Sequence, residues 1–162
     1  MRAADKVATA RDTLARIGAL PRPVVFTNGV FDILHRGHVA YLEEARRLGA
    51  SLVVAVNTDA SVRRLGKGDE RPLNTLDDRM AVLAALASVD LVAAFDTDTP
   101  RDLIIAARPD ILVKGGDYLV ATTAGATEVI AAGGRFVAIP FAHARSTSLL
   151  VERIRGATRG RG

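Results

Sequence analysis

Two of the three histidines of this 162-residue chain lie within four residues, in the segment His35-Arg36-Gly37-His38. The segment follows an apolar run at residues 24–26 and precedes a helical pattern of apolar residues over 39–48. The first amides of a helix are unpaired and carry the positive end of the helix dipole, and a glycine beside them lets a ligand approach the backbone. We therefore predict that this turn binds phosphate, with both imidazoles contacting it.

A second group that could bind an oxyanion precedes an apolar stretch near the C-terminus. It consists of Arg145, Ser146, Thr147 and Ser148, just before Leu149. At the start of a helix, hydroxyl groups and backbone amides donate hydrogen bonds while the arginine supplies charge, so this group could hold phosphates. The alternative is that the hydroxyl groups only cap the helix.

A third group is the cationic loop over residues 63–71, in which Lys67 lies between Gly66 and Gly68. Glycine leaves the backbone free to rearrange, so we expect a mobile lid that brings Lys67 over a bound nucleotide. The alternative is an ordinary solvated turn. Arg71, which ends this loop, and Arg79 are further candidates for the same contact.

Three more polar residues follow apolar runs. Asp32 could contact a ligand or form an Asx turn, and Lys114 could contact a ligand or cap a strand. Asp117 follows the same apolar run as Lys114, whereas we expect His143 to be structural.

The elements that must position these residues alternate along the chain. Five short runs rich in Val, Ile, Phe and Ala predict buried strands at 24–27, 51–57, 89–95, 111–114 and 136–140. Helical patterns between them lie at 39–48, 59–65, 76–87, 100–107 and 127–132. Such alternation predicts an α/β fold, a Rossmann-like α/β/α sandwich with a five-stranded parallel sheet, whose ligands bind at the carboxyl ends of the strands.

The length suits one domain over residues 1–162. Within it we expect an amphipathic N-terminal helix at about 1–20, a catalytic core at 24–154 and a basic, flexible tail at 155–162. We also expect Gly49 and Gly133 to end helices.

Composition and missing motifs exclude several function classes. The chain has no cysteine, which excludes disulfides and thiolate catalysis. No apolar run approaches the length of a membrane span and no signal peptide is evident, so we expect a cytoplasmic protein. Aromatic residues make up 4% of the chain, which argues against nucleic-acid binding. The histidines lack further zinc ligands, and neither a Walker P-loop nor a serine-hydrolase elbow is present.

The segment 26–38, FTNGVFDILHRGH, resembles the H-x-G-H signature of the cytidylyltransferase-like nucleotidyltransferase superfamily. Longer strings at 56–65, 71–74, 78–83, 109–118 and 146–148 resemble the D-glycero-β-D-manno-heptose 1-phosphate adenylyltransferases, in their stand-alone form without a fused sugar kinase. The likeness runs from about residue 24 to 154. Relatives often carry cysteine where this chain has Val30.

The resemblance implies transfer of AMP from ATP to a heptose 1-phosphate, giving ADP-heptose and pyrophosphate for the lipopolysaccharide core. Mg²⁺ would be carried by the phosphates of ATP and not by a protein site. The implied partners are ATP and a sugar 1-phosphate, with no nucleic acid and no membrane, and homodimerisation is left open. One alternative is a cytidylyltransferase that acts on glycerol 3-phosphate or another alcohol phosphate. A more distant one is a non-catalytic nucleotide-binding module.

The resemblance also assigns roles to individual residues. The implied catalytic residues are His35, His38 and Lys67. The implied nucleotide-binding residues are Val30, Phe31, Gly37, Arg145, Ser146, Thr147 and Ser148. The implied residues on the sugar phosphate side are Asp32, Arg71, Lys114 and Asp117.

Overall fold

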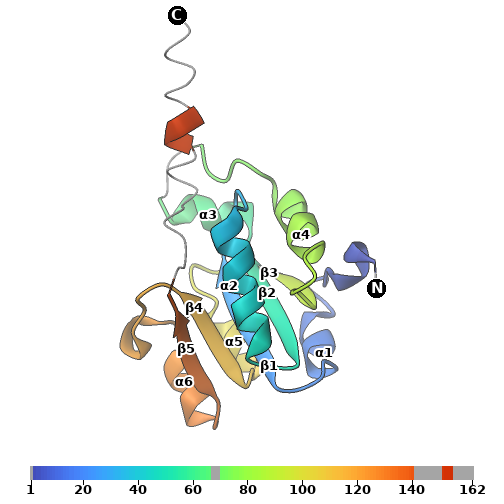
Figure 1. The fold of residues 1–162 in the computed structure, drawn as a ribbon, viewed down its shortest axis with the longest axis vertical. Coiled ribbons are helices and arrows are strands. Elements are labelled where there is room, and N and C mark those ends of the chain that lie inside the picture. The colour runs from blue at the N-terminus through green and yellow to red at the C-terminus, as the bar shows by residue number, and fades with distance from the viewer. Residues whose placement is uncertain (1, 67–69, 141–150, 155–162) are drawn as a thin grey trace, which may run out of the picture.

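A computed structural model describes residues 2–66, 70–140 and 151–154 of the chain. Its strands form one parallel sheet in the order β3-β2-β1-β4-β5 (Figure 1). The strands are β1 (Val24–Gly29), β2 (Ser51–Asn57), β3 (Leu91–Phe95), β4 (Ile111–Gly115) and β5 (Arg135–Ile139). The predicted five-stranded parallel sheet is therefore confirmed. The chain runs outward from β1 to β3 and then returns to place β4 beside β1, so the strand order reverses between β1 and β4.

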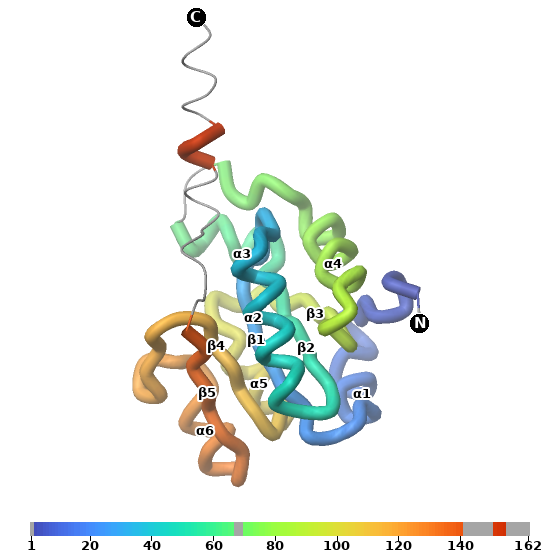
Figure 2. The backbone as a smooth tube through the Cα atoms, viewed as in Figure 1, coloured from blue at the N-terminus to red at the C-terminus, as the bar shows by residue number. Residues whose placement is uncertain are grey.

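Helices cover both faces of the sheet, as the alternating pattern predicted (Figure 2). They are α1 (Thr13–Gly18), α2 (Arg36–Arg47), α3 (Asp59–Arg64), α4 (Leu76–Ala84), α5 (Arg101–Ala107) and α6 (Ala126–Ala131). Two 3₁₀ turns are η1 (Ala3–Lys6) and η2 (Val120–Thr122), and residues 151–154 are helical. The predicted helix at 39–48 begins three residues earlier, and the predicted helix at 76–87 ends three residues earlier.

The N-terminus differs from the single helix predicted for residues 1–20. Directly after η1 the backbone of Val7 is extended, and Val7 forms an isolated parallel bridge with Val92 of β3. The backbone N–H of Ala8 donates to the carbonyl oxygen of Val92 at 2.8 Å. Helical spacing of apolar residues gives no sign of this pairing. Here the backbone groups bond to the edge of β3, whereas in a continuous helix they would bond to one another.

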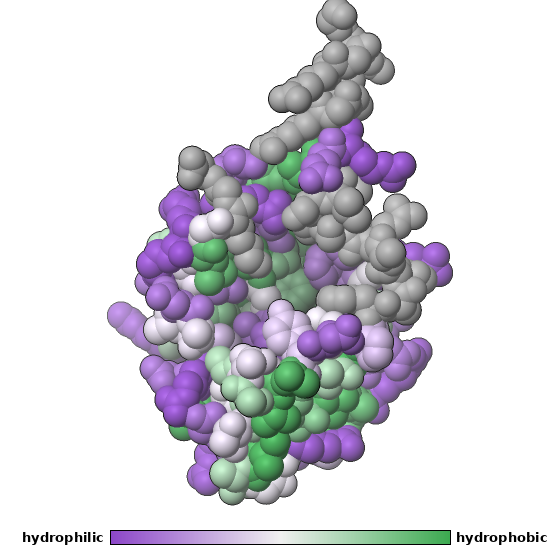
Figure 3. All heavy atoms as spheres, turned by 90° about the vertical axis from the view of Figure 1, so that its left-hand side faces the viewer, coloured by the Kyte–Doolittle hydropathy of each residue, from purple (hydrophilic) through white to green (hydrophobic). Residues whose placement is uncertain are grey.

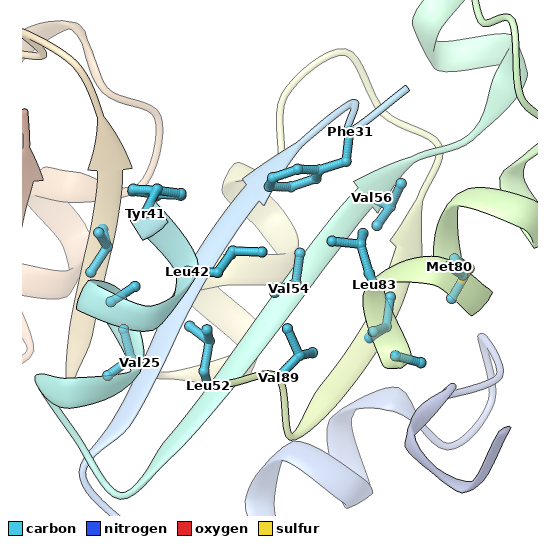
Figure 4. Close-up of a cluster of buried hydrophobic side chains, with 14 of the residues drawn as sticks. Val25, Phe31, Tyr41, Leu42, Leu52, Val54, Val56, Met80, Leu83 and Val89 are labelled. Carbon is cyan, nitrogen blue, oxygen red and sulfur yellow. The ribbon is translucent and has the colours of Figure 1, made fainter. Parts of the chain in front are cut away.

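Two apolar layers fill the space between the sheet and its helices. On one face, Leu42 of α2 and Leu83 of α4 pack in the same buried cluster as Val54 of β2 (Figure 4). On the other face, Ile17 of α1 and Ile104 of α5 pack in the cluster that contains neighbouring strand residues. Because both sides of each inner strand are buried, those strands are continuous apolar runs and not alternating ones.

The two glycines that were predicted to end helices have different structural roles. Gly133 follows α6 with a φ of 87°, the left-handed conformation that favours glycine at this position. Gly49 follows α2 without a positive φ, but a Cβ there would collide with the carbonyl oxygen of Pro23 and the side chain of Val25. Gly49 is thus needed for the close approach of α2 to the start of β1.

The surface at the β5 edge of the sheet carries an apolar strip bordered by polar side chains (Figure 3). Leu119 and Ile130 are among the large apolar residues that the described chain exposes, at 69% and 45%. Within the described ranges, no helix is both long enough and apolar enough to span a bilayer.

Candidate active site

The histidine turn starts helix α2. His35 is the N-cap residue, with extended backbone, and its Nδ1 accepts a hydrogen bond from the backbone N–H of Gly37 at 3.1 Å. A side-chain acceptor at this position satisfies one of the amides that the helix leaves unpaired. Because Nδ1 accepts, neutral His35 carries its proton on Nε2, which makes Nε2 a donor.

The rings of His35 and His38 stack, with centroids 3.9 Å apart and planes inclined by 25°. Phe31 contacts His38 edge-on at 5.4 Å. Burial, and then the neighbouring His35, lower the pKa of His38 from 6.5 to about 4, so this ring is neutral at neutral pH. The Nδ1 atom of His38 is buried and has no hydrogen-bond partner among the described residues. A ligand atom at this position would remove the penalty of an unpaired buried polar atom.

The backbone just before the histidines is strained. Phe31 has a φ of 49°, in the left-handed region that bulky residues rarely adopt. Its side chain is 8% exposed and points over the sheet into the apolar cluster (Figure 4). Burial of this ring supports the unusual turn, which directs the chain from the end of β1 into the histidine segment.

A pocket of about 160 Å³ lies where the strand order reverses, between the carboxyl ends of β1 and β4. Its lining consists of Asn28, Gly29, Val30, Phe31, His38, Tyr41, Lys114, Gly115 and Tyr118. The Nζ atom of Lys114 lies 2.5 Å from Oδ1 of Asn28 and 5.9 Å from the centre of the Tyr118 ring. The structure thus brings Lys114, Val30 and Phe31 together with His38, at the place where α/β sheets bind ligands.

Asp32 and Arg71 contact each other, although the sequence separates them by about forty residues. Nε of Arg71 lies 3.0 Å from a carboxylate oxygen of Asp32, and both side chains are largely buried. The same carboxylate accepts hydrogen bonds from the backbone N–H groups of Leu73 and Asn74 at 3.0 and 2.9 Å. These contacts orient Arg71 and hold its segment against the histidine loop. Direct binding of sugar hydroxyls by Asp32 stays a prediction.

The other residues predicted for the site lie in different places relative to the pocket or outside the described ranges. Gly37 is buried at the start of α2, where its N–H donates to His35. Asp117 is exposed and does not line the pocket. Five predicted residues lie outside the described ranges: Lys67, Arg145, Ser146, Thr147 and Ser148.

Two buried residues lie near the histidine loop: Tyr41 was not predicted as part of the site, and Arg79 was predicted only as an alternative phosphate contact. Tyr41, which lines the pocket, shares a 2.6 Å hydrogen bond with Thr27, and burial raises the pKa of its hydroxyl group. Arg79 of α4 is fully buried and hydrogen-bonds to the histidine loop. A sequence signal for Arg79 did exist, because an arginine three residues after Leu76 and four before Leu83 lies on the apolar face of its helix.

Comparisons with known proteins agree with this geometry. The chain is 63% identical over 138 residues to D-beta-D-heptose 1-phosphate adenylyltransferase of Bordetella bronchiseptica, and the match covers 85% of each protein. It is 57% identical over 134 residues to the bifunctional protein HldE of Alkalilimnicola ehrlichii, covering 83% of this chain but 28% of that relative. The chain therefore spans less than a third of the bifunctional protein's length.

Solved structures share the fold. The lipopolysaccharide core biosynthesis protein from Thermoplasma volcanium matches with a TM-score of 0.62 at 30% identity, over 75% of this chain and 98% of that one. Pantothenate synthetase from Thermus thermophilus matches in fold alone, with a TM-score of 0.57 at 22% identity, over 86% of this chain and 62% of that one. The cytidylyltransferase-like family model matches residues 26–152. With this match over most of its length, and with the histidine pair at the strand-order reversal, the chain belongs to the cytidylyltransferase-like family.

Proposed function

We propose that the chain is an adenylyltransferase that transfers AMP from ATP to D-β-D-heptose 1-phosphate, giving ADP-heptose and pyrophosphate. The observation that carries this proposal is the stacked pair of His35 and His38 at the start of α2, beside the pocket between β1 and β4. The heptose substrate is supported by the 63% identical relative that bears this activity in its name. The product would serve lipopolysaccharide core synthesis, and with ATP as the donor we expect the reaction in the cytoplasm.

The proposed reaction is an in-line displacement. A phosphate oxygen of the sugar attacks the α-phosphorus of ATP, a new P–O bond forms, and the bond from that phosphorus to the bridging oxygen breaks to release pyrophosphate. No covalent protein intermediate is needed, so catalysis consists of orientation and of stabilising the charge that develops on the phosphate oxygens. His35, with its proton on Nε2, and neutral His38 are the proposed donors to those oxygens.

The proposed triphosphate contacts extend beyond the histidines. We propose that Lys67 closes over the phosphates and that Arg145 and the hydroxyl groups of Ser146–Ser148 hold the β- and γ-phosphates. Within residues 2–66, 70–140 and 151–154, no group of three or more His, Cys, Asp or Glu side chains is placed to hold a metal ion. We propose that Mg²⁺ enters with ATP, where it would neutralise charge on the phosphate oxygens.

The sugar phosphate would bind at the cationic side of the same pocket. Lys114 lines it, and Arg71 is oriented by Asp32 beside the histidine loop. The contact with Asp32 uses Nε of Arg71, and no other described residue pairs with its guanidinium, so its terminal nitrogens can take a phosphate. Asp117 is the remaining proposed hydroxyl ligand.

Pyrophosphate release tests the proposal. The purified chain is incubated with ATP or CTP against the α and β anomers of heptose 1-phosphate and against glycerol 3-phosphate, in the presence of Mg²⁺. Release with ATP and the β anomer alone is the expected result. Preferred use of CTP with glycerol 3-phosphate would replace the proposal with a cytidylyltransferase, and no release with any pair would favour a nucleotide-binding module.

A further inference from the structure

Arg79 is a fully buried arginine, with a side-chain exposure of 0%. Its guanidinium reaches several acceptors at once. Nε donates to the carbonyl oxygen of Asn74 at 3.1 Å, and Nη1 donates to that of Val30 at 2.7 Å. Nη2 donates to the carbonyl oxygen of Asn57 and to a carboxylate oxygen of Asp59, both at 2.8 Å. The single positive charge is thus paired with one carboxylate and three carbonyl oxygens.

These acceptors belong to separate parts of the candidate site. Val30 begins the loop that carries the histidines and immediately precedes the strained Phe31. Asn74 closes the segment that carries Arg71. Asn57 is the last residue of β2, and Asp59 is the first of α3. One side chain therefore ties the histidine loop to the Arg71 segment and anchors both to the carboxyl edge of the sheet.

An arginine is needed here for physical reasons. Its planar guanidinium carries five donors in fixed directions, so it can bond to acceptors on several sides. A lysine has one nitrogen and cannot reach all of these atoms. An uncharged residue would leave three carbonyl oxygens and the Asp59 carboxylate without this donor. Stability alone does not demand such an arrangement, because well-packed apolar residues often replace buried ion pairs without loss.

We propose that Arg79 is a positioning residue that fixes the histidine loop relative to Arg71, and so aligns the groups on either side of the reacting phosphates. The inference rests on the proposed function for its chemistry, but the alignment itself belongs to the folded chain. Arg79 does not touch substrate. It acts through the carbonyl oxygen of Val30 on one side and that of Asn74 on the other.

Kinetics of Arg79→Lys provide the first test. We expect kcat to fall on the order of a hundredfold, the scale for small misplacements of reacting groups. The KM for ATP should stay within about threefold, because alignment matters most in the transition state. Asp59→Asn is the milder variant, which removes the charge of one partner and keeps an oxygen, and it should lower kcat less. All assays are run well below the melting temperature of each variant.

Arg46→Lys is the matched control. Arg46 donates to the carbonyl oxygen of Gly49 at 2.7 Å and pairs with Asp90 at 2.8 Å, at the opposite end of α2. This variant makes the same substitution at a partly exposed arginine with two contacts away from the site, and it should keep its kcat. In Arg79→Ala, added guanidinium at a non-denaturing concentration should restore part of the activity, whereas it should not help His35→Ala.

A measurement that does not depend on catalytic turnover tests the positioning role of Arg79 separately from the proposed function. The chain has three histidines, so NMR gives three sets of ring resonances, assigned with single His→Gln variants. Arg79→Lys and Asp59→Asn should shift the resonances of His35 and His38, and Arg46→Lys should not. If wild type releases no pyrophosphate, the proposed function fails while these resonances still decide the inference. Unshifted histidine resonances, or a kcat loss in Arg79→Lys no larger than in Arg46→Lys, would overturn it.

Discussion

Protonation of His38 should destabilise the folded chain at mildly acidic pH. Burial and then His35 lower the pKa of this ring to about 4, from 6.5. The unfolded chain therefore takes up a proton near pH 6.5, which the folded chain does not accept until about pH 4. The contribution of His38 to stability is thus complete above pH 6.5 and is lost as the pH falls toward 4.

The size of the effect follows from the two pKa values. For a fully buried ring, the difference between them would correspond to about 3.4 kcal/mol. His38 is only partly buried, so solvent screening reduces this figure to roughly 1.5 kcal/mol. Somewhat more than half of that, about 1 kcal/mol, should be lost between about pH 7.5 and about pH 5.

Urea unfolding of wild type and His38→Gln at both pH values measures this loss. Carboxylates titrate in both proteins, so the difference between the two pH dependences isolates the ring. Wild type should lose about 1 kcal/mol more than His38→Gln over this interval. Equal losses of stability in the two proteins would refute the argument that burial lowers the pKa of His38. A larger loss in His38→Gln would mean that folding raises this pKa.

Three further substitutions test the proposed roles. His35→Ala should lower kcat by roughly a hundredfold with a smaller change in ATP affinity, as measured by steady-state kinetics and calorimetry. Thr147→Ala should raise the KM for ATP at an unchanged melting temperature; a loss of about 1 kcal/mol in stability with normal kinetics would instead identify a helix cap. Lys67→Ala should lower kcat/KM without changing the melting temperature, and normal kinetics would remove Lys67 from the site.

The order of strands and helices could be predicted because each inner strand is buried on both faces. Residues 51–57, for example, are all buried and form an apolar run that no exposed element would show. The N-terminal segment could not be predicted in the same way. Its pattern at Val7, Leu14 and Ile17 has helical spacing, but the pairing of Val7 with Val92 depends on an edge strand that lies far along the chain.

The site was predictable to the extent that neighbours in sequence are neighbours in space. His35 and His38 meet because they lie one turn apart at the start of one helix. Lys114 joins them because parallel strands end at the same edge of the sheet. The pairing of Asp32 with Arg71 depends on how a distant segment folds back, which no local pattern specifies. The surroundings of Arg79 could not be predicted for the same reason, since its acceptors at Val30, Asn57 and Asp59 come from distant parts of the chain.

Helix α2 has a mechanical property that follows from the close contact at Gly49. The helix has 12 residues, so it is a rod of about 18 Å with the histidines at one end and the glycine contact at the other. Because a Cβ at Gly49 would lie only 2.4 Å from the carbonyl oxygen of Pro23, little free space separates this end of the helix from the start of β1. We therefore expect the histidines to adjust to a bound nucleotide by rotation of their own side chains or by tilting of α2 about its crowded end.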